Sequence, residues 1–169
     1  MIVRGAEPAD AEAIAAIYAH HVLHGTATFD TEPPDAHAWR AKLSGIIENG
    51  WPVLVAERNG RTVGYAYATQ FRDRPAYVAT CENSIYVAPD ALGNGVGTAL
   101  LRDLVERAAQ SGFAEMIAVI GGGEPASVAL HARLGFEHAG RLREVGRKFG
   151  CLLDTVYMQR PLAREADLR

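Results

Sequence analysis

The chain has 169 residues, of which 49% are hydrophobic and 22% charged, and its formal net charge at pH 7 is -3. This composition is typical of a globular domain with a sizeable core, and the charge argues against a broad nucleic-acid-binding surface. No apolar run is long enough to cross a membrane. Without a secretion signal or a CxxC motif, the sequence predicts a cytoplasmic protein with reduced thiols.

The first part of the chain is predicted to be a strand followed by two helices. Residues 2–4 favour a strand, and apolar residues then recur on one helical face from Ile14 until Gly25. Residues 26–35 are predicted to be a loop, because their two prolines preclude a helix. Asp35 is the expected N-cap of the second helix.

Six strands and two helices are predicted to follow. Asn59-Gly60 is a strong hairpin signal between the first two of these strands. The apolar run 115–120 is typical of a strand buried on both faces. In chain order, the predicted elements are strands 52–57, 63–68 and 81–87, helix 95–109, strand 115–120, helix 127–134 and two closing strands at 137–144 and 155–159.

The order of these elements predicts one α/β domain over residues 1–162 and a polar tail over 163–169. The strand-helix-strand unit in the middle should make strands 81–87 and 115–120 parallel, with a right-handed crossover.

A glycine-rich turn separates the strand at 81–87 from the helix that follows it. Pro89-Asp90 end the strand, and Gly93, Gly95 and Gly97 precede the helical pattern. Glycines let the backbone approach a ligand closely, and a helix start adds free N–H groups and the positive end of a dipole. Together they predict a cradle for an anion, most often a phosphate.

Three kinds of phosphate-binding glycine loop compete for this turn. A Walker loop needs Gly-Lys-Ser/Thr, but Gly97 is followed directly by Thr98. The dinucleotide fingerprint Gly-x-Gly-x-x-Gly fails at its sixth position, Thr98, and the turn follows the fourth predicted strand rather than the first. The pyrophosphate loop of acyl-CoA enzymes is therefore the favoured interpretation.

The segment 92–97, Leu-Gly-Asn-Gly-Val-Gly, resembles the Gln/Arg-x-x-Gly-x-Gly/Ala motif of the GNAT superfamily of N-acetyltransferases. Leu92 departs from that pattern, and residues 127–136 resemble the superfamily's helix-then-Gly-Phe block. The chain is most similar to the phosphinothricin and methionine sulfoximine acetyltransferases over residues 2–162. The segments that carry this similarity are 29–33, 77–87, 118–121 and 140–154.

The resemblance implies the GNAT fold, a mixed and mostly antiparallel sheet of six or seven strands flanked by helices. It implies acetyl-CoA as co-substrate, no metal, a homodimer, and acetyl transfer to the α-amine of a small amino-acid-like substrate such as phosphinothricin or methionine sulfoximine. The residues that it implies for binding acetyl-CoA are Ile85, Tyr86, Val87, Gly93, Asn94, Gly95, Val96, Gly97, Thr98 and Ser127.

Acetyl transfer to an amine needs a base, because an amine with a pKa near that of lysine is mostly protonated at neutral pH. Glu82 stands at the position of the resembled family's catalytic glutamate and is the candidate base for direct attack on the thioester. Judged without the resemblance, Glu82 is better explained as a solvated or salt-bridged residue at the start of a strand than as a base. A backbone N–H near Val87 is the expected oxyanion donor, where GNAT proteins splay two strands apart.

His131 stands where many superfamily members have a tyrosine proposed as general acid toward the leaving thiolate. An imidazole suits that catalytic role, and a helix-surface histidine packed against the cofactor explains the residue equally well. Glu124 is the nearest equivalent of an asparagine that often contacts CoA, and it departs from the family pattern.

Arg72 and Arg74 precede the strand that carries Glu82, and two guanidiniums there suit capture of a substrate carboxylate. Solvated loop arginines are the alternative. Phe29 is a candidate wall of the substrate pocket, with core packing as its alternative, and Tyr77 is a further substrate-binding candidate. The segment Cys151-Leu-Leu-Asp154 lacks the aromatic, histidine-rich pattern of phosphinothricin enzymes, which favours another substrate if this hairpin lines the pocket.

Other functions stay open at this point: acetyl transfer to a protein N-terminus or a polyamine, and acyl-CoA binding without catalysis. The loop arginines disfavour a polycation, whereas Leu92 and Glu124 keep the non-catalytic sensor open. His20 and His24 have the i, i+4 spacing of metal ligands, and His21 lies beside them. No second cluster supports a metal, so a core or surface role is favoured.

Overall fold

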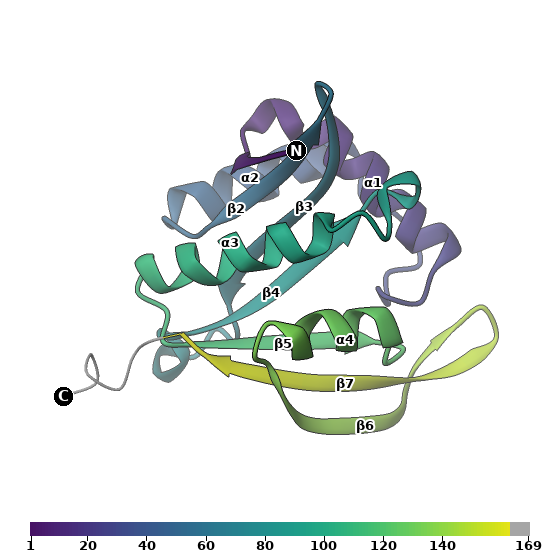
Figure 1. The fold of residues 1–169 in the computed structure, drawn as a ribbon. Helices are drawn as coiled ribbons and strands as arrows, with labels where there is room; N and C mark the ends of the chain where they lie inside the picture. The colour runs from purple at the N-terminus through teal and green to yellow at the C-terminus, as the bar shows by residue number, and fades with distance from the viewer. Residues whose placement is uncertain (163–169) are drawn as a thin grey trace.

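The structure is a computed structural model that describes residues 1–162; the polar tail predicted at 163–169 lies outside the described residues. One seven-stranded sheet, in the order β1-β2-β3-β4-β5-β7-β6, has helices on both faces (Figure 1). The predicted α/β class and mixed sheet are confirmed. Within residues 1–162, no helix combines the length and apolarity that a bilayer crossing requires.

The elements lie close to their predicted positions along most of the chain. The strands are β1 (Ile2–Gly5), β2 (Val53–Arg58), β3 (Arg61–Gln70), β4 (Thr80–Val87), β5 (Glu115–Gly121), β6 (Glu137–Lys148) and β7 (Cys151–Pro161). The α-helices are α1 (Ala11–His24), α2 (Ala36–Glu48), α3 (Val96–Gln110) and α4 (Pro125–Arg133). Short 3-10 turns cover Pro8–Asp10, Pro75–Tyr77 and Pro89–Ala91.

The helix starts follow from capping side chains. The carboxylate of Asp35 accepts a hydrogen bond from the N–H of Ala38 at 2.8 Å, which confirms the predicted N-cap of α2. Helix α4 begins two residues earlier than predicted, because Pro125 occupies its first turn and the Glu124 carboxylate accepts from the N–H of Ser127 at 2.8 Å. Glu124, which replaces the asparagine of the family pattern, therefore serves as the N-cap of α4.

Two helix layers enclose the sheet, with α1 and α2 on one face and α3 and α4 on the other (Figure 1). Under α1 and α2 the core is aromatic, since the buried Trp39 meets Tyr65 edge-on at 5.3 Å between ring centroids. Helix α3 lies close to β3 because Gly64 has no side chain: a Cβ there would be 2.9 Å from Val96.

Strands β4 and β5 run parallel, as predicted, but they pair only from Thr80 opposite Glu115 to Asn83 opposite Ala118. Strand β4 continues to Val87, and the two strands diverge beyond Asn83 (Figure 1). This fork confirms the splay that the family resemblance implies. It leaves one backbone edge of β4 without a strand partner within the described residues.

The hairpin of β6 and β7 is longer than predicted. The expected strands 137–144 and 155–159 stop short of the turn, whereas β6 continues to Lys148 and β7 begins at Cys151. Most of β6 is exposed and charged, so it lacks the apolar alternation by which a strand is recognised. The register also shifts between Leu142 and Gly146, where three residues of β6 lie opposite Asp154. Glu144 in this bulge has a φ of 58°.

Candidate active site

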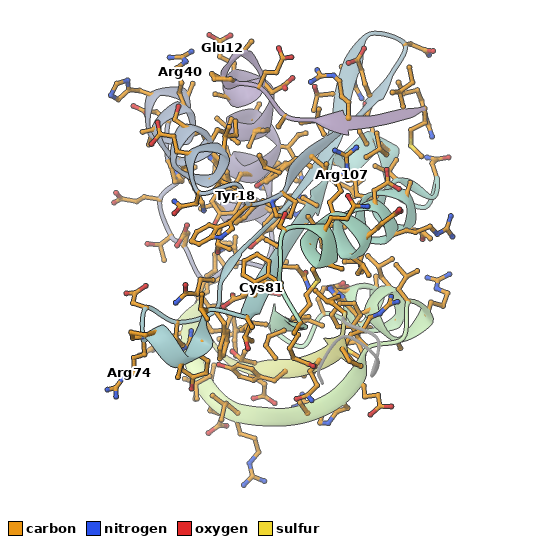
Figure 2. All side chains as sticks on the ribbon, turned by 90° about the vertical axis from the view of Figure 1, so that its left-hand side faces the viewer. Glu12, Tyr18, Arg40, Arg74, Cys81 and Arg107 are labelled. Atoms are coloured by element: carbon orange, nitrogen blue, oxygen red, sulfur yellow. The ribbon has the colours of Figure 1, made fainter. Side chains whose placement is uncertain are left out.

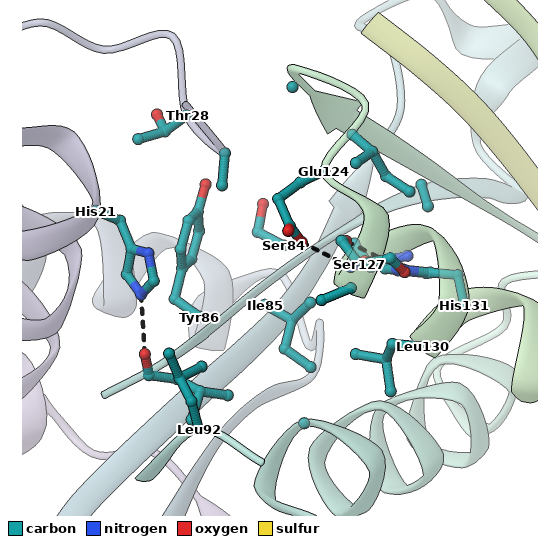
Figure 3. A pocket seen from close by; sticks show the side chains of 18 of the residues that line it. His21, Thr28, Ser84, Ile85, Tyr86, Leu92, Glu124, Ser127, Leu130 and His131 are labelled. Carbon is teal, nitrogen blue, oxygen red and sulfur yellow. Dashed lines mark hydrogen bonds between the residues drawn. The ribbon is translucent and has the colours of Figure 1, made fainter. Parts of the chain in front are cut away.

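A cavity of about 710 Å³ occupies the fork between β4 and β5. Its walls come from β4, β5, the starts of α3 and α4, and the loop after α1 (Figure 3). It is lined both by Ser84 and Tyr86, on the α1–α2 side of β4, and by Ile85 and Val87, on the α3–α4 side. The cavity therefore joins the two faces of the sheet.

One end of the cavity is the glycine loop. Gly93 and Gly95 have φ values of 74° and 76°, and a Cβ at either position would meet nothing within 4 Å, so the backbone lies open to a ligand. Gly95 caps α3, whose first N–H groups have no partner within the helix. Open backbone at the positive end of a helix fits the diphosphate of an acyl-CoA.

Most residues predicted to bind the cofactor line this cavity. Asn94 does not: its carbonyl faces Arg58 at 3.4 Å, and its side chain donates to the carbonyl of Leu92 at 3.1 Å. Leu92 itself lines the cavity although it is exposed. The predicted residues that line it are Ile85, Tyr86, Val87, Gly93, Gly95, Val96, Gly97, Thr98 and Ser127.

Glu82 lies in the cavity wall on β4, with 32% of its side chain exposed. Burial raises the pKa of its carboxyl, and the positive charges of Arg72 and Lys42 act against that shift. Arg72 Nη1 is 4.0 Å from the Glu82 carboxylate. Lys42, on α2, was not expected; its Nζ donates to the hydroxyl of Tyr67 at 2.7 Å. A carboxylate in this setting can accept a proton from an amine.

The other predicted substrate residues are placed differently from one another. Arg72 reaches Glu82, whereas Arg74 points away from the body of the protein (Figure 2). Tyr77 packs edge-on against Phe71, with ring centroids 5.6 Å apart. Of these, Arg72, Arg74 and Tyr77 are absent from the cavity wall, while Phe29 lines it and is 38% exposed.

His131 is buried, with an exposed fraction of 1%, although it borders the cavity. Its Nδ1 is 2.8 Å from the carbonyl oxygen of Ser127, and its Nε2 is 3.1 Å from Oδ1 of Asn83. Burial lowers the pKa of the ring, and the bond to Ser127 acts against that shift. Both nitrogens are thus engaged within the protein, which corrects the expectation of a helix-surface histidine.

Asn83, His21 and Thr28 are among the lining residues of the cavity that were not predicted as site residues. Asn83 donates from Nδ2 to the carbonyl of Ile117 on β5 at 3.4 Å, directly at the fork. His21 Nε2 is 2.9 Å from the carbonyl oxygen of Val87, where β4 ends (Figure 3). Thr28 is buried, with its hydroxyl 2.7 Å from that of Tyr18. A polar residue on the buried face of the 81–87 strand could have signalled Asn83; no sequence pattern signals Thr28.

Of the histidines on α1, His20 and His24 are exposed and His21 is half-buried. The rings of His20 and His24 contact each other with centroids 4.9 Å apart, and His21 faces β4. Among residues 1–162, His, Cys, Asp and Glu side chains gather nowhere in a group of three that could hold a metal. Cys81 and Cys151 are both free thiols.

A forked parallel strand pair beside a glycine loop, with a carboxylate at the base of the fork, is the arrangement expected of an acetyl-CoA-dependent N-acetyltransferase. The comparisons with known proteins agree. The chain belongs to the acetyltransferase (GNAT) family, whose sequence profile matches residues 14–136.

Its relatives include enzymes that acetylate small molecules. The chain is 51% identical to phosphinothricin N-acetyltransferase of Alcaligenes faecalis, over 95% of this chain and 82% of that protein. It is 40% identical to L-methionine sulfoximine/L-methionine sulfone acetyltransferase of Pseudomonas aeruginosa, over 93% and 92%. The crystal structure of a phosphinothricin acetyltransferase from Sinorhizobium meliloti with AcCoA is 47% identical, with a TM-score of 0.94 over 96% of this chain and 88% of that one.

Proposed function

We propose that this enzyme transfers the acetyl group of acetyl-CoA to the α-amine of a small amino acid of the phosphinothricin or methionine sulfoximine type. The observation that carries the proposal is the placement of Glu82 in the cavity wall at the base of the fork, with the Arg72 guanidinium 4.0 Å from its carboxylate. An amino acid offers an amine and a carboxylate to those two groups. The named activities of the relatives support the same acceptor class.

Glu82 acts as the general base in this proposal. It takes a proton from the ammonium form of the acceptor, directly or through water, and the freed amine attacks the thioester carbonyl. The unpaired edge of β4 beyond Asn83 supplies a backbone N–H for the developing oxyanion near Val87. The C–N bond forms and the C–S bond breaks, with its electron pair leaving on the thiolate. The nitrogen releases its second proton to solvent as it becomes the neutral amide.

His131 is the candidate general acid for protonating that thiolate. Both of its ring nitrogens face oxygen atoms of the protein, at Ser127 and Asn83. This geometry supports a structural role at the fork over a role as general acid. A CoA thiol has a pKa near that of an ordinary thiol, so solvent in the open cavity can protonate it.

The choice among acceptors depends on the end of the cavity opposite the glycine loop. Thr28 and Phe29 line the cavity there. In this proposal Arg72, which lies outside the cavity wall beside Glu82, binds the carboxylate of the acceptor. Neither Leu152 nor Leu153 lines the cavity, so the departure of their segment from the phosphinothricin pattern gives no reason to exclude phosphinothricin.

The direct test measures thiol release from acetyl-CoA with phosphinothricin, methionine sulfoximine and methionine sulfone, beside an N-terminal peptide and a polyamine. We expect acceptor-dependent release with the amino acids and little with the other two. Turnover only with the peptide or polyamine would redirect the assignment to another amine. Tight acetyl-CoA binding with no acceptor-dependent release would identify a sensor.

We also expect a homodimer in the cytoplasm. The β6–β7 hairpin exposes apolar side chains that a second copy could cover, namely Leu142, Val145, Phe149 and Leu152. Free thiols at both cysteines suit a reducing compartment. Light scattering of the purified protein measures the oligomeric state, and charged substitution at Val145 and Leu152 should lower it if this surface is the interface.

A further inference from the structure

We propose that Gly146 and Lys148, both on β6, are positioning residues for the acceptor end of the cavity and act through Phe29 and Thr28. Neither residue lines the cavity, and both contact the loop after α1 that does. The kinetic consequence of this inference rests on the proposed function. The contacts themselves do not.

The ring of Phe29 lies on the backbone of Gly146. A Cβ built at Gly146 would be 2.2 Å from one ring carbon of Phe29 and 2.7 Å from two others, so the ring would have to move. On β5, a Cβ at Gly121 would be 3.1 Å from the same ring. Two strands without side chains at these points therefore form the seat of the ring. Phe29 also lines the cavity.

Lys148 holds the neighbouring residue of the same loop. It is buried to 5% exposure, and its Nζ donates to the carbonyl oxygen of Thr28 at 2.9 Å. A buried ammonium without a partner is costly, so the bond resists any displacement of the loop. The side chain of Thr28 is held separately, through Tyr18, whose hydroxyl donates to Asp30 at 2.6 Å.

The bulge of β6 sets which residue lies under Phe29. Arg143, Glu144 and Val145 lie opposite Asp154 alone, and the register resumes with Gly146 opposite Leu153. Asp154 fixes the bulge by accepting from the N–H of Glu144 at 2.9 Å and from Nε of Arg141 at 2.6 Å. Because side chains alternate along a strand, a shift of one residue would turn Gly146 away from Phe29.

Phe29 and the glycine loop lie in different walls of the cavity, one after α1 and the other before α3. A displaced ring should therefore change the room for the acceptor side chain and leave the diphosphate end intact. Gly146 is in this sense a specificity-determining position that contacts no substrate.

The test compares Gly146→Ala with Gly140→Ala on the same strand, where a Cβ would meet nothing within 4 Å. Amide hydrogen exchange of the segment 26–35 measures the contact without reference to any substrate. We expect faster exchange in Gly146→Ala and in Lys148→Met, and unchanged exchange in Gly140→Ala. Unchanged exchange in both test variants would overturn the inference.

The kinetic test measures KM for methionine sulfoximine and the affinity for acetyl-CoA separately. Because a displaced Phe29 ring changes the room for the acceptor side chain, Gly146→Ala should raise the acceptor KM by roughly tenfold and leave the acetyl-CoA affinity within about twofold. Adding Phe29→Ala should remove the effect of Gly146→Ala, because the clash is gone. A Gly146→Ala defect of equal size in the Phe29→Ala background would contradict a role through Phe29.

Failure of the proposed function would look different. In that case the wild-type enzyme would turn over none of the amino acids, while the exchange difference between Gly146→Ala and Gly140→Ala would persist. If instead the wild-type enzyme acetylates methionine sulfoximine and Gly146→Ala matches it in both exchange and KM, the positioning role alone is wrong.

Discussion

The imidazole of His131 and the carboxamide of Asn83 meet where β4 and β5 separate, with Nε2 and Oδ1 3.1 Å apart. The same carboxamide donates to the carbonyl of Ile117 on β5, so one side chain joins both arms of the fork and α4. The other ring nitrogen bonds to Ser127 in α4. The hydrogen bonds of Asn83 and His131 thus link β4, β5 and α4 at the base of the fork, and we call this link the polar bridge.

Replacing His131 by Ala should weaken that bridge. The change leaves a cavity and deprives Oδ1 of Asn83 of its partner, and we expect a loss of about 2–4 kcal/mol in the free energy of unfolding. Urea denaturation measures it. His138→Ala, at an exposed position on β6, is the matched control and should stay within about 0.5 kcal/mol of wild type. Equal stability of the two variants would show that the bridge contributes nothing.

Glu82→Gln tests the base. Loss of general base catalysis should lower kcat by roughly 10²–10⁴ at neutral pH, with acetyl-CoA affinity unchanged. Glu106→Gln, at an exposed site on α3, should keep full activity. Full activity in Glu82→Gln would remove this carboxylate from the mechanism.

The same variant should be more stable than wild type at neutral pH. Because burial raises the folded-state pKa of Glu82 above its ordinary value, the folded state binds this proton more tightly than the unfolded state. The associated stability is present below the unfolded pKa and is lost as pH rises through the folded pKa. Glutamine does not ionise, so this loss disappears; a melting temperature below that of wild type at pH 7 would contradict the argument.

The pH dependence of kcat/KM tests whether the charge of Arg72 acts on the pKa of Glu82. The positive charge of Arg72 lowers the pKa of Glu82, so Arg72→Gln should raise that pKa and move the acid limb of the profile to higher pH. Arg74→Gln is the matched control, since Arg74 points away from the protein. A shift of the acid limb in Arg74→Gln alone would show that the positive charge acting on Glu82 is not that of Arg72.

The glycine loop is tested by Gly95→Ala against Gly60→Ala. The φ values of 76° and 75° are alike, and a Cβ at either position would meet nothing within 4 Å, so each change costs about 1–2 kcal/mol of backbone strain. Only Gly95 lies in the cavity, and only its variant should bind acetyl-CoA more weakly by calorimetry. Equal affinities in the two variants would separate the loop from the cofactor.

Local signals predicted much of this fold. The Asn59-Gly60 turn, the Asp35 cap and the parallel placement of β4 and β5 are confirmed, because turn chemistry, capping and crossover handedness act over short distances. The ends of β6 and β7 were wrong because that hairpin is exposed, charged and bulged. Its strands are held by pairing rather than by an apolar pattern.

The site was predictable where a motif stands in one segment. The glycine loop and the β4 residues lie in the cavity as expected. Thr28, Lys42 and Asn83 were missed because their roles come from contacts across the fold, to Lys148, Tyr67 and His131. Arg72, Arg74 and Tyr77 all lie outside the cavity wall, and of the two arginines Arg72 is the one that reaches Glu82.

Because the fork opens the sheet from one face to the other, acetyl-CoA and the acceptor amine can enter the cavity from different faces. Neither has to depart before the other arrives, and both can be present when the bond is made. We therefore expect initial-rate plots that intersect, in the manner of a ternary complex. A single molecule with CoA joined to an amino acid should bind more tightly than either part alone.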